Sequence, residues 1–286
     1  MNKKNIILQN TLINSKGRTF KQNLYGILEY RYLSYLFFKR NIAIYYKQTI
    51  LGPLWFLIQP LLMTLVFLVV FNKIAQIDTG EIPPSLFYMS GIIIWTYFSD
   101  SLSQISVSFT ANAGLFNKIY FPRLIMPISV LMTNIFKLAV QIFILLILLV
   151  IVESQNEFVH NITLVSVFAV ILYIVLTSIL SLGAGLIISS FTAKYKDLNH
   201  LVGFGIRLLM YLSPIIYPIS SVPNNLKSLI IINPMTAPIQ GFRGILNSSS
   251  MPSIEMVLYS FICSIVLLSI GLLLFFKTEK KFIDTI

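Results

Sequence analysis

Apolar residues in this chain gather into long, nearly uninterrupted blocks, without the narrow stripe of an amphipathic helix. A bilayer core about 30 Å thick needs roughly 20 apolar residues for each helix that crosses it. Six blocks approach or exceed that length, over residues 54–75, 86–110, 127–152, 162–190, 198–219 and 254–276. The pattern predicts an all-α membrane protein with six transmembrane helices.

Two of these blocks are less apolar than the others, because the second contains Asp100 and the fifth contains Arg207 and ends at prolines. We keep both because the basic residues agree with six crossings. Sixteen of the 21 Lys and Arg residues then lie on one side of the membrane and three on the other. Basic residues near span ends are held in the cytoplasm, so a multi-pass protein with both termini cytoplasmic is expected.

The segment before the first span, residues 24–51, is rich in aromatic and basic residues. An apolar arc of a helix there would carry Leu28, Tyr35, Ile42 and Tyr46, and a charged arc would carry Glu29, Arg40 and Lys47. This predicts an amphipathic helix in the membrane interface, with a cytoplasmic helix packed on a partner as the alternative. Residues 1–23 form an N-terminal extension without an assigned role, and no cleavable signal peptide is expected.

A second unusual segment follows the fifth block, where an apolar run at 229–232 lies among prolines between 220 and 253. The run is too short to cross a bilayer, which predicts an interfacial or re-entrant element between spans five and six. Residues 52–286 are then one six-span domain.

Composition supports lipid as the solvent, since 56% of the residues are hydrophobic and only 11% are charged. The net charge of +11 lies mostly between apolar blocks, so membrane topology explains it better than nucleic-acid binding. The single cysteine, Cys263, allows no intrachain disulfide and no cysteine metal cluster.

Catalytic motifs are not evident. No G-x-x-x-x-G-K-[ST] sequence is present, so a partner must supply any energy from ATP. The two histidines, His160 and His200, fall on opposite sides of the predicted membrane, which disfavours a membrane-embedded transferase. The pairs Gly183/Gly185 and Gly203/Gly205 are interpreted as helix-packing positions rather than as dinucleotide loops.

Several short motifs resemble the type-2 ABC exporter permeases. They are Leu51-Gly52-Pro53-Leu54-Trp55 before Gln59-Pro60, residues 117–123 before Pro127, Tyr195-Lys196-Asp197-Leu198, Ser213-Pro214-Ile215-Ile216-Tyr217-Pro218, and Asn233-Pro234-Met235 before Arg243. Their order and spacing are similar to those of the subgroup that exports O-antigen, capsule and teichoic acid, from about residue 30 onwards.

The resemblance implies a homodimer in the bacterial inner membrane, bound to two cytoplasmic ABC ATPase subunits that hold ATP and Mg. The expected cargo is a polyprenyl-diphosphate-linked polysaccharide, with O-antigen first and capsule, teichoic acid or a small hydrophobic compound as alternatives. The chain itself is expected to have no cofactor and no enzymatic activity. The resemblance also implies re-entrant helices between Pro218 and Pro252, with a plain ordered loop as the alternative. It further implies an ATPase-coupling helix over 112–123 and a second cytoplasmic contact, with the candidate residues Phe116, Lys118, Tyr120, Phe121, Arg123, Tyr195 and Asp197.

Three charges inside the spans, Asp100, Lys137 and Arg207, fall at nearly one depth along their helices. Asp100 could pair with Lys137 or Arg207, which leaves one positive charge in excess. That charge either faces a channel and attracts the lipid diphosphate, or only ties helices together. Aromatic residues that could stack on sugar rings, or form a lipid belt instead, are Tyr88, Trp95, Tyr97, Tyr211 and Tyr217.

Overall fold

The computed structural model describes residues 26–283 except 27, 48–49, 117, 119–120, 156–163, 196 and 247–250. Within these ranges, helices are the only regular secondary structure, which confirms the predicted all-α fold. The predicted extension 1–23 lies outside the described residues.

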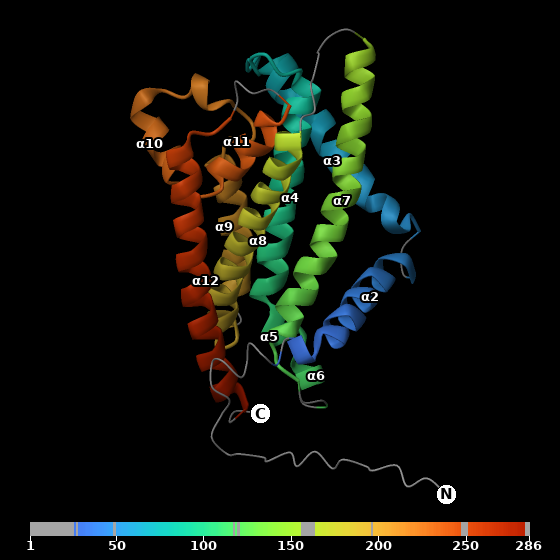
Figure 1. The fold of residues 1–286 in the computed structure, drawn as a ribbon, viewed down its shortest axis with the longest axis vertical. Helices are drawn as coiled ribbons and strands as arrows, with labels where there is room; N and C mark the ends of the chain where they lie inside the picture. Colours follow the sequence, from blue (N-terminus) through green and yellow to red (C-terminus); the bar gives the residue numbers. More distant parts are fainter. Residues whose placement is uncertain are drawn as a thin grey trace, which may run out of the picture.

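Long helices run side by side and form the body of the molecule (Figure 1). They are α4 (Pro84–Ser106), α7 (Ile125–Ser154), α8 (Leu164–Thr192) and α12 (Ile254–Ile283). Helix α4 is central, since it packs against α7 and α8 and also against α3 (Trp55–Phe67), α9 (Leu198–Tyr211) and α11 (Thr236–Gly244). Its buried side chains therefore form much of the core.

Among the residues that the structure describes, four stretches are long and apolar enough to cross a membrane, and they match the first, third, fourth and sixth predicted blocks. They are Gly52–Ile74, Ile125–Ser154, Ser166–Thr192 and Ile254–Glu279. The second block forms α4, whose 23 residues are mostly buried by neighbouring helices. A helix enclosed in this way touches little lipid, so its polar residues can find protein partners.

The fifth block forms a shorter helix than the sequence predicts. Helix α9 has 14 residues and ends at Tyr211, just before Ser213 and Pro214. At about 1.5 Å per residue it is roughly 21 Å long, which is less than a bilayer core.

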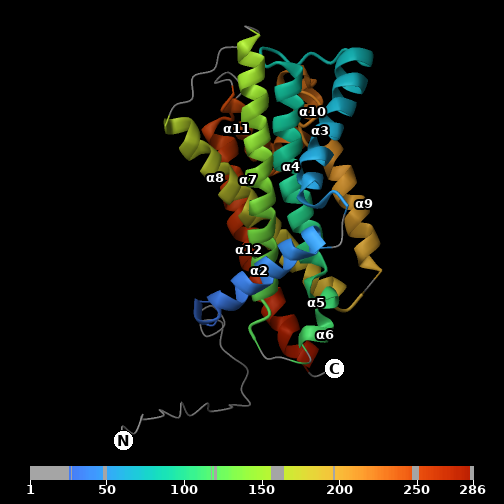
Figure 2. The same ribbon diagram turned by 90° about the vertical axis from the view of Figure 1, so that its right-hand side faces the viewer.

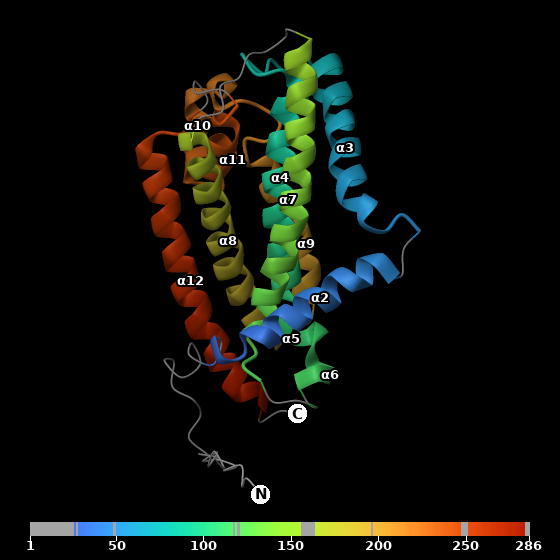
Figure 3. The same ribbon diagram turned by 45° about the vertical axis from the view of Figure 1, so that its right-hand side comes forward.

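Helix α2 (Arg31–Lys47) crosses α7 obliquely, and Figures 2 and 3 show it lying over the outside of the bundle. Ser34 and Phe37 are buried against the bundle, whereas Leu28 and Tyr35 are 69% and 41% exposed. These two residues of the predicted apolar arc therefore face away from the protein, and Ile42 is half-buried. A helix within 24–51 is confirmed, and its place in the membrane interface stays a prediction.

A sharp turn separates α2 from the first candidate span. The span begins with a 3-10 turn, η1 (Gly52–Leu54), continues through α3 and ends in the π-helix η2 (Leu68–Ile74). Gly52 has a φ of +52°, a conformation that side-chain-bearing residues rarely adopt. This glycine lets the chain reverse directly into α3.

Two short helices follow α9 and the 3-10 turn η3 (Ile219–Ser221). They are α10 (Asn224–Ile232) and α11, at one end of the bundle (Figure 1). Nearly all of α11 is buried among α4, α8 and α12. Its Gly241 lies so close to the Tyr173 ring that a Cβ atom would be only 2.0 Å from a ring atom. Short helices occur where the sequence predicts them, and their depth in the membrane stays a prediction.

The predicted packing role of the glycine pairs is confirmed for one pair only. A Cβ atom on Gly183 would lie 2.5 Å from the Leu268 backbone, and one on Gly185 would lie 2.6 Å from Ile105. These glycines allow α8 to approach α12 and α4 closely. Gly203 and Gly205 on α9 have no neighbour within 4 Å, so the prediction is wrong for them within a single chain.

Candidate functional site

Lys137 of α7 and Asp100 of α4 form the ion pair that their depth suggested. The Lys137 Nζ lies 3.8 Å from Asp100 Oδ2, and it donates a hydrogen bond of 2.8 Å to the Tyr45 hydroxyl. It also lies 4.5 Å from the centroid of the Tyr45 ring and 5.4 Å from that of Phe56. The Lys137 side chain is 10% exposed and that of Asp100 41% exposed, so the cation is the more enclosed partner.

Polar side chains spaced by four residues fasten α2 and α3 to α7. Thr133 Oγ1 accepts from the Asn41 amide at 3.5 Å, and the Gln141 amide donates to the Phe56 carbonyl at 3.4 Å. Lys137 lies between these two residues on the same helix face. Sequence reasoning named only Lys137, although the repeat of polar residues at 133, 137 and 141 inside an apolar span was a usable signal.

Arg207 lies apart from this ion pair. It is exposed on α9, and no ion pair joins it to another described residue. Exposed apolar side chains surround it on the same helix: Leu201, Phe204, Leu208 and Tyr211. Of the two pairings considered for Asp100, the one with Lys137 is formed, and Arg207 is the cation in excess.

The aromatic candidates fall into two groups. Tyr88, Trp95 and Tyr97 are buried inside the single chain, and the Tyr97 hydroxyl is hydrogen-bonded to Ser178 Oγ at 2.5 Å. Tyr211 is 59% exposed at the end of α9, and its carbonyl accepts a hydrogen bond of 3.0 Å from Tyr217. Only the second group lies at the surface of the single chain.

Arg243 of α11 is buried to 2% exposure and ties three segments together. Its Nε donates to the Phe87 carbonyl of α4 at 3.2 Å, while Nη1 and Nη2 donate to the carbonyls of Pro214 and Ile215. The guanidinium also lies over the Phe87 ring, 3.6 Å from its centroid. In the sequence analysis, Arg243 was counted among the basic residues outside the membrane. The structure shows that it is buried and that it connects three segments of the chain through these hydrogen bonds.

Asn233 also forms hydrogen bonds that stabilise the turn after α9, which contains Ser213, Pro214 and Ile215. Its amide donates to Ser213 Oγ at 2.8 Å, and its Oδ1 accepts from the Met235 backbone at 3.0 Å. The Ser213–Pro218 motif, the Asn233–Met235 motif and Arg243 are separate in the sequence, yet they meet at one end of the bundle. Each of the three supplies part of one hydrogen-bonded turn.

The predicted coupling segment is linked to both α2 and α12 by a chain of aromatic rings. Successive centroids lie 5.5, 5.6, 6.3 and 4.4 Å apart. The rings, in spatial order, are those of Phe37, Phe121, Phe116, Phe109 and Phe275. They come from α2, the loop before α7, α6 (Ala113–Phe116), α5 (Ser108–Ala111) and α12. Phe116 and Phe121 of this segment are therefore packed into the chain.

Arg123 adds a polar tie to α12. Its backbone N–H donates to Glu279 Oε1 at 3.2 Å, and its Nη1 donates to the Glu279 carbonyl at 3.4 Å. Phe121 and Arg123 are buried, whereas Lys118 is exposed, and Tyr120 lies outside the described residues. Lys118 is thus the described basic residue of this segment that a partner protein can reach.

The second predicted cytoplasmic contact is exposed at both described positions. Tyr195 is 49% exposed, with the Lys194 ammonium 4.8 Å from its ring centroid, and Asp197 is exposed just before α9. In the described part of the chain, no three His, Cys, Asp or Glu residues come together to hold a metal ion.

Comparison with known proteins gives the chain its family, since the model of the "ABC-2 type transporter" family matches residues 32–247. The chain belongs to the ABC-2 type transporter family. The chain is 26% identical to the O-antigen export system permease protein RfbA of Klebsiella pneumoniae, covering 86% of this chain and 91% of RfbA. RfbA of Myxococcus xanthus is also 26% identical, over 91% of this chain and 97% of RfbA. The polysialic acid transport protein KpsM of Escherichia coli is 25% identical, over 87% of this chain and 94% of KpsM.

These similarities confirm the family resemblance that the motifs indicated. With its apolar helices, this ABC-2 chain is a multi-pass membrane protein, and relatives of this kind are transport permeases rather than enzymes.

Proposed function

We propose that the chain is the permease subunit of an ABC exporter that carries lipid-linked O-antigen outward across the bacterial inner membrane. The observation that carries this proposal is the alignment with O-antigen export permeases over 91% and 97% of their lengths. A capsule exporter is the second candidate, because KpsM aligns over 94% of its length at 25% identity. A fold alone does not define a cargo, so the choice between them rests on these relatives.

The proposed topology has six crossings, with α4 and α9 added to the four apolar stretches and both termini in the cytoplasm. The distribution of Lys and Arg supports this arrangement. The helices α10 and α11 are then re-entrant elements on the outer side, between spans five and six. Helix α11 is buried among α4, α8 and α12, which is what such an element requires at membrane depth, and α10 packs against α11.

A second copy of the chain is proposed to cover α9. None of the residues of α9 is buried in the single chain, and its two glycines leave open space that a neighbouring helix can approach. A path between two copies would then be lined by Arg207, Tyr211 and Tyr217. In this arrangement Arg207 attracts the diphosphate of the lipid carrier, while the Asp100–Lys137 pair, Trp95 and Tyr97 act through packing.

Two cytoplasmic ABC ATPase subunits are proposed to bind ATP and Mg and to push on residues 112–123. The aromatic chain and the Arg123–Glu279 hydrogen bonds support this assignment, because they connect that segment to α2 and α12. Lys118, Tyr195 and Asp197 would touch the ATPase, whereas Phe116, Phe121 and Arg123 would transmit the movement. Tyr120 is proposed as a further contact on the basis of the motif alone.

Deletion of the gene tests the cargo. The expected result is loss of O-antigen from the cell surface and accumulation of the lipid-linked glycan inside, identified by mass spectrometry of the lipid extract. Wild-type protein should restore export, while the Arg207→Met variant should not. Accumulation of a capsule precursor would favour the second candidate, and unchanged surface glycan of both kinds would refute polysaccharide export.

A further inference from the structure

The face of α2 that points away from the bundle is basic and has no acidic residue. From Arg31 to Lys47 the helix contains four basic residues and neither Asp nor Glu. All four are exposed: Arg31, Lys39, Arg40 and Lys47. Partial burial lowers the pKa of Arg40, yet a guanidinium remains protonated at neutral pH. The face is therefore positive under physiological conditions.

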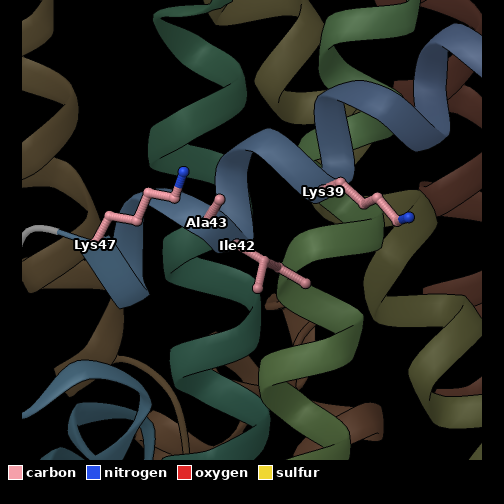
Figure 4. A pocket seen from close by; sticks show the side chains of 4 residues that line it. All are labelled: Lys39, Ile42, Ala43 and Lys47. Carbon is pink, nitrogen blue, oxygen red and sulfur yellow. The ribbon is translucent and has the colours of Figure 1, made fainter.

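A shallow hollow lies on this face. Its volume is about 410 Å³, and it is lined by Lys39, Ile42, Ala43 and Lys47. Figure 4 shows these side chains projecting from α2 on the side away from the ribbons of the bundle behind it. The floor is apolar and the two ends are cationic. Lysines eight positions apart are separated by about 12 Å along a helix axis, so their ammonium groups can flank a bulky anionic group.

The position of the hollow matches the edge of a membrane. Lys47 precedes by five residues the first stretch able to cross a bilayer, Gly52–Ile74. Tyr32 and Tyr35 extend the exposed face of α2, and tyrosines are enriched where lipid headgroups meet the hydrocarbon. The opposite face cannot take part, because Phe37 is buried and Tyr45 contacts Lys137.

The geometry points to a binding site for an anionic phospholipid on the outward face of α2, with its phosphate between Lys39 and Lys47 and an acyl chain on Ile42 and Ala43. Charge complementarity selects this occupant, because basic residues at a membrane surface attract anionic lipids. A zwitterionic lipid lacks the net charge to use both lysines. The site lies apart from α9, where the proposed function places the cargo, so it is independent of which glycan is carried.

The test uses the purified full-length chain in a neutral detergent with equal amounts of phosphatidylglycerol and phosphatidylcholine, and native mass spectrometry counts each bound lipid. We expect wild type to prefer phosphatidylglycerol. The Lys39→Gln, Lys47→Gln double variant should lose about 30-fold of that preference. Both substitutions are at exposed positions, so folding should be unaffected.

Two matched variants separate the site from general charge effects. Lys39→Arg, Lys47→Arg should retain the preference, and so should Lys73→Gln, Lys227→Gln, which removes two charges from other helices. The proposal fails if wild type shows no preference, if the glutamine variant at 39 and 47 keeps it, or if the variant at 73 and 227 loses as much.

Two competitors distinguish other occupants of the same face. Farnesyl diphosphate should not displace phosphatidylglycerol when added in equal amount, and displacement would reassign the hollow to the lipid carrier of the cargo. Added ATPase subunits should leave the bound phosphatidylglycerol in place. Its release would show that the face belongs to a protein partner, and would overturn the lipid assignment.

Discussion

Arg243 lies against Phe87, with its guanidinium 3.6 Å from the ring centroid and its Nε 3.2 Å from the Phe87 carbonyl oxygen. Its remaining donors reach the carbonyls of Pro214 and Ile215, so backbone dipoles surround the charge. Among the described residues no carboxylate forms an ion pair with it. One side chain thus couples the first turn of α4 to α11 and to the turn that follows α9.

Replacing Arg243 should weaken the packing of α11 against α4 and against the turn that follows α9. Arg243→Met removes a donor from three carbonyls: that of Phe87 still accepts from the Ser90 hydroxyl, whereas those of Pro214 and Ile215 lose their side-chain donor, at a cost of about 1–3 kcal/mol each. Arg243→Lys keeps the charge but cannot reach three acceptors at once, so it should rescue only in part. We expect a lower unfolding temperature in detergent for both variants, with Met below Lys. Equal unfolding temperatures for Arg243→Met and wild type would show that the hydrogen bonds of Arg243 do not stabilise the fold.

Gly91→Ala is a matched control that leaves Arg243 unchanged. The added Cβ would lie 2.6 Å from an Arg243 guanidinium nitrogen, so the side chain must move. The variant should reproduce part of the loss seen in Arg243→Met. Gly114→Ala on α6 adds the same atom where nothing lies within 4 Å and should not lower the unfolding temperature.

The parts of this fold in contact with lipid were predictable, because the bilayer imposes length and composition on each spanning helix. The Asp100–Lys137 pair was predictable for a similar reason, since two charges at one depth have few partners there. The contacts of Arg243 were not predictable, because its guanidinium donates to backbone carbonyls and every residue has one. Likewise, the pattern placed Trp95 in a predicted span but did not predict that α4 would be enclosed by protein.

Removing Asp100 and removing Lys137 from their ion pair should reduce the yield of folded protein to different extents. Asp100→Asn leaves the enclosed Lys137 charge with only the Tyr45 hydroxyl and the rings, whereas Lys137→Met leaves a carboxylate that is 41% exposed. We expect Asp100→Asn to lower the yield of folded protein more than Lys137→Met does. The double variant should recover most of the yield, because an unpaired buried charge is the costly state. A double variant as poor as Asp100→Asn would show that the pair has a role beyond neutralisation.

The Arg207→Met variant tests the hypothesis that Arg207 attracts the diphosphate of the lipid carrier. Because Arg207 is exposed and unpaired among the described residues, its loss should not reduce folded protein in the membrane. Surface glycan should nevertheless fall if Arg207 attracts the lipid diphosphate. Normal export by this variant, together with normal export by the Asp100→Asn, Lys137→Met double variant, would reject a role for all three charges in substrate binding.

Within the predicted coupling segment, residues 112–123, Phe121 is buried and Lys118 is exposed, so their substitutions should have different effects. Phe121→Ala removes a buried ring between Phe37 and Phe116, and such truncations cost about 3–5 kcal/mol in a core. It should lower export per ATP hydrolysed, while Phe121→Leu keeps most of the volume and should be milder. Lys118→Glu leaves the packing intact and should weaken ATPase binding, measured by co-purification. Full co-purification of the Lys118→Glu variant would move the contact elsewhere.

Topology is tested by single cysteines in a chain whose Cys263 has been replaced by serine. Cysteines at 160 and 227 should react with a membrane-impermeant maleimide from outside. Those at 118, 195 and 280 should react only after permeabilisation. The residues Lys118 and Tyr195 are exposed, so a lack of reaction in intact cells reflects the side of the membrane rather than burial. External labelling at 118 would reject the six-span arrangement.

The two glycine pairs separate contacts within one chain from contacts between copies. Gly183→Val places atoms where a Cβ alone already meets the Leu268 backbone at 2.5 Å, so it should prevent the folding of the monomer. A Cβ atom at Gly203 meets nothing within 4 Å in the single chain, so folded Gly203→Val protein should be obtained. If α9 packs against a second copy, Gly203→Val should shift the protein from dimer to monomer in size-exclusion chromatography with light scattering. A Gly203→Val protein that remains fully dimeric would show that the copies meet through another helix.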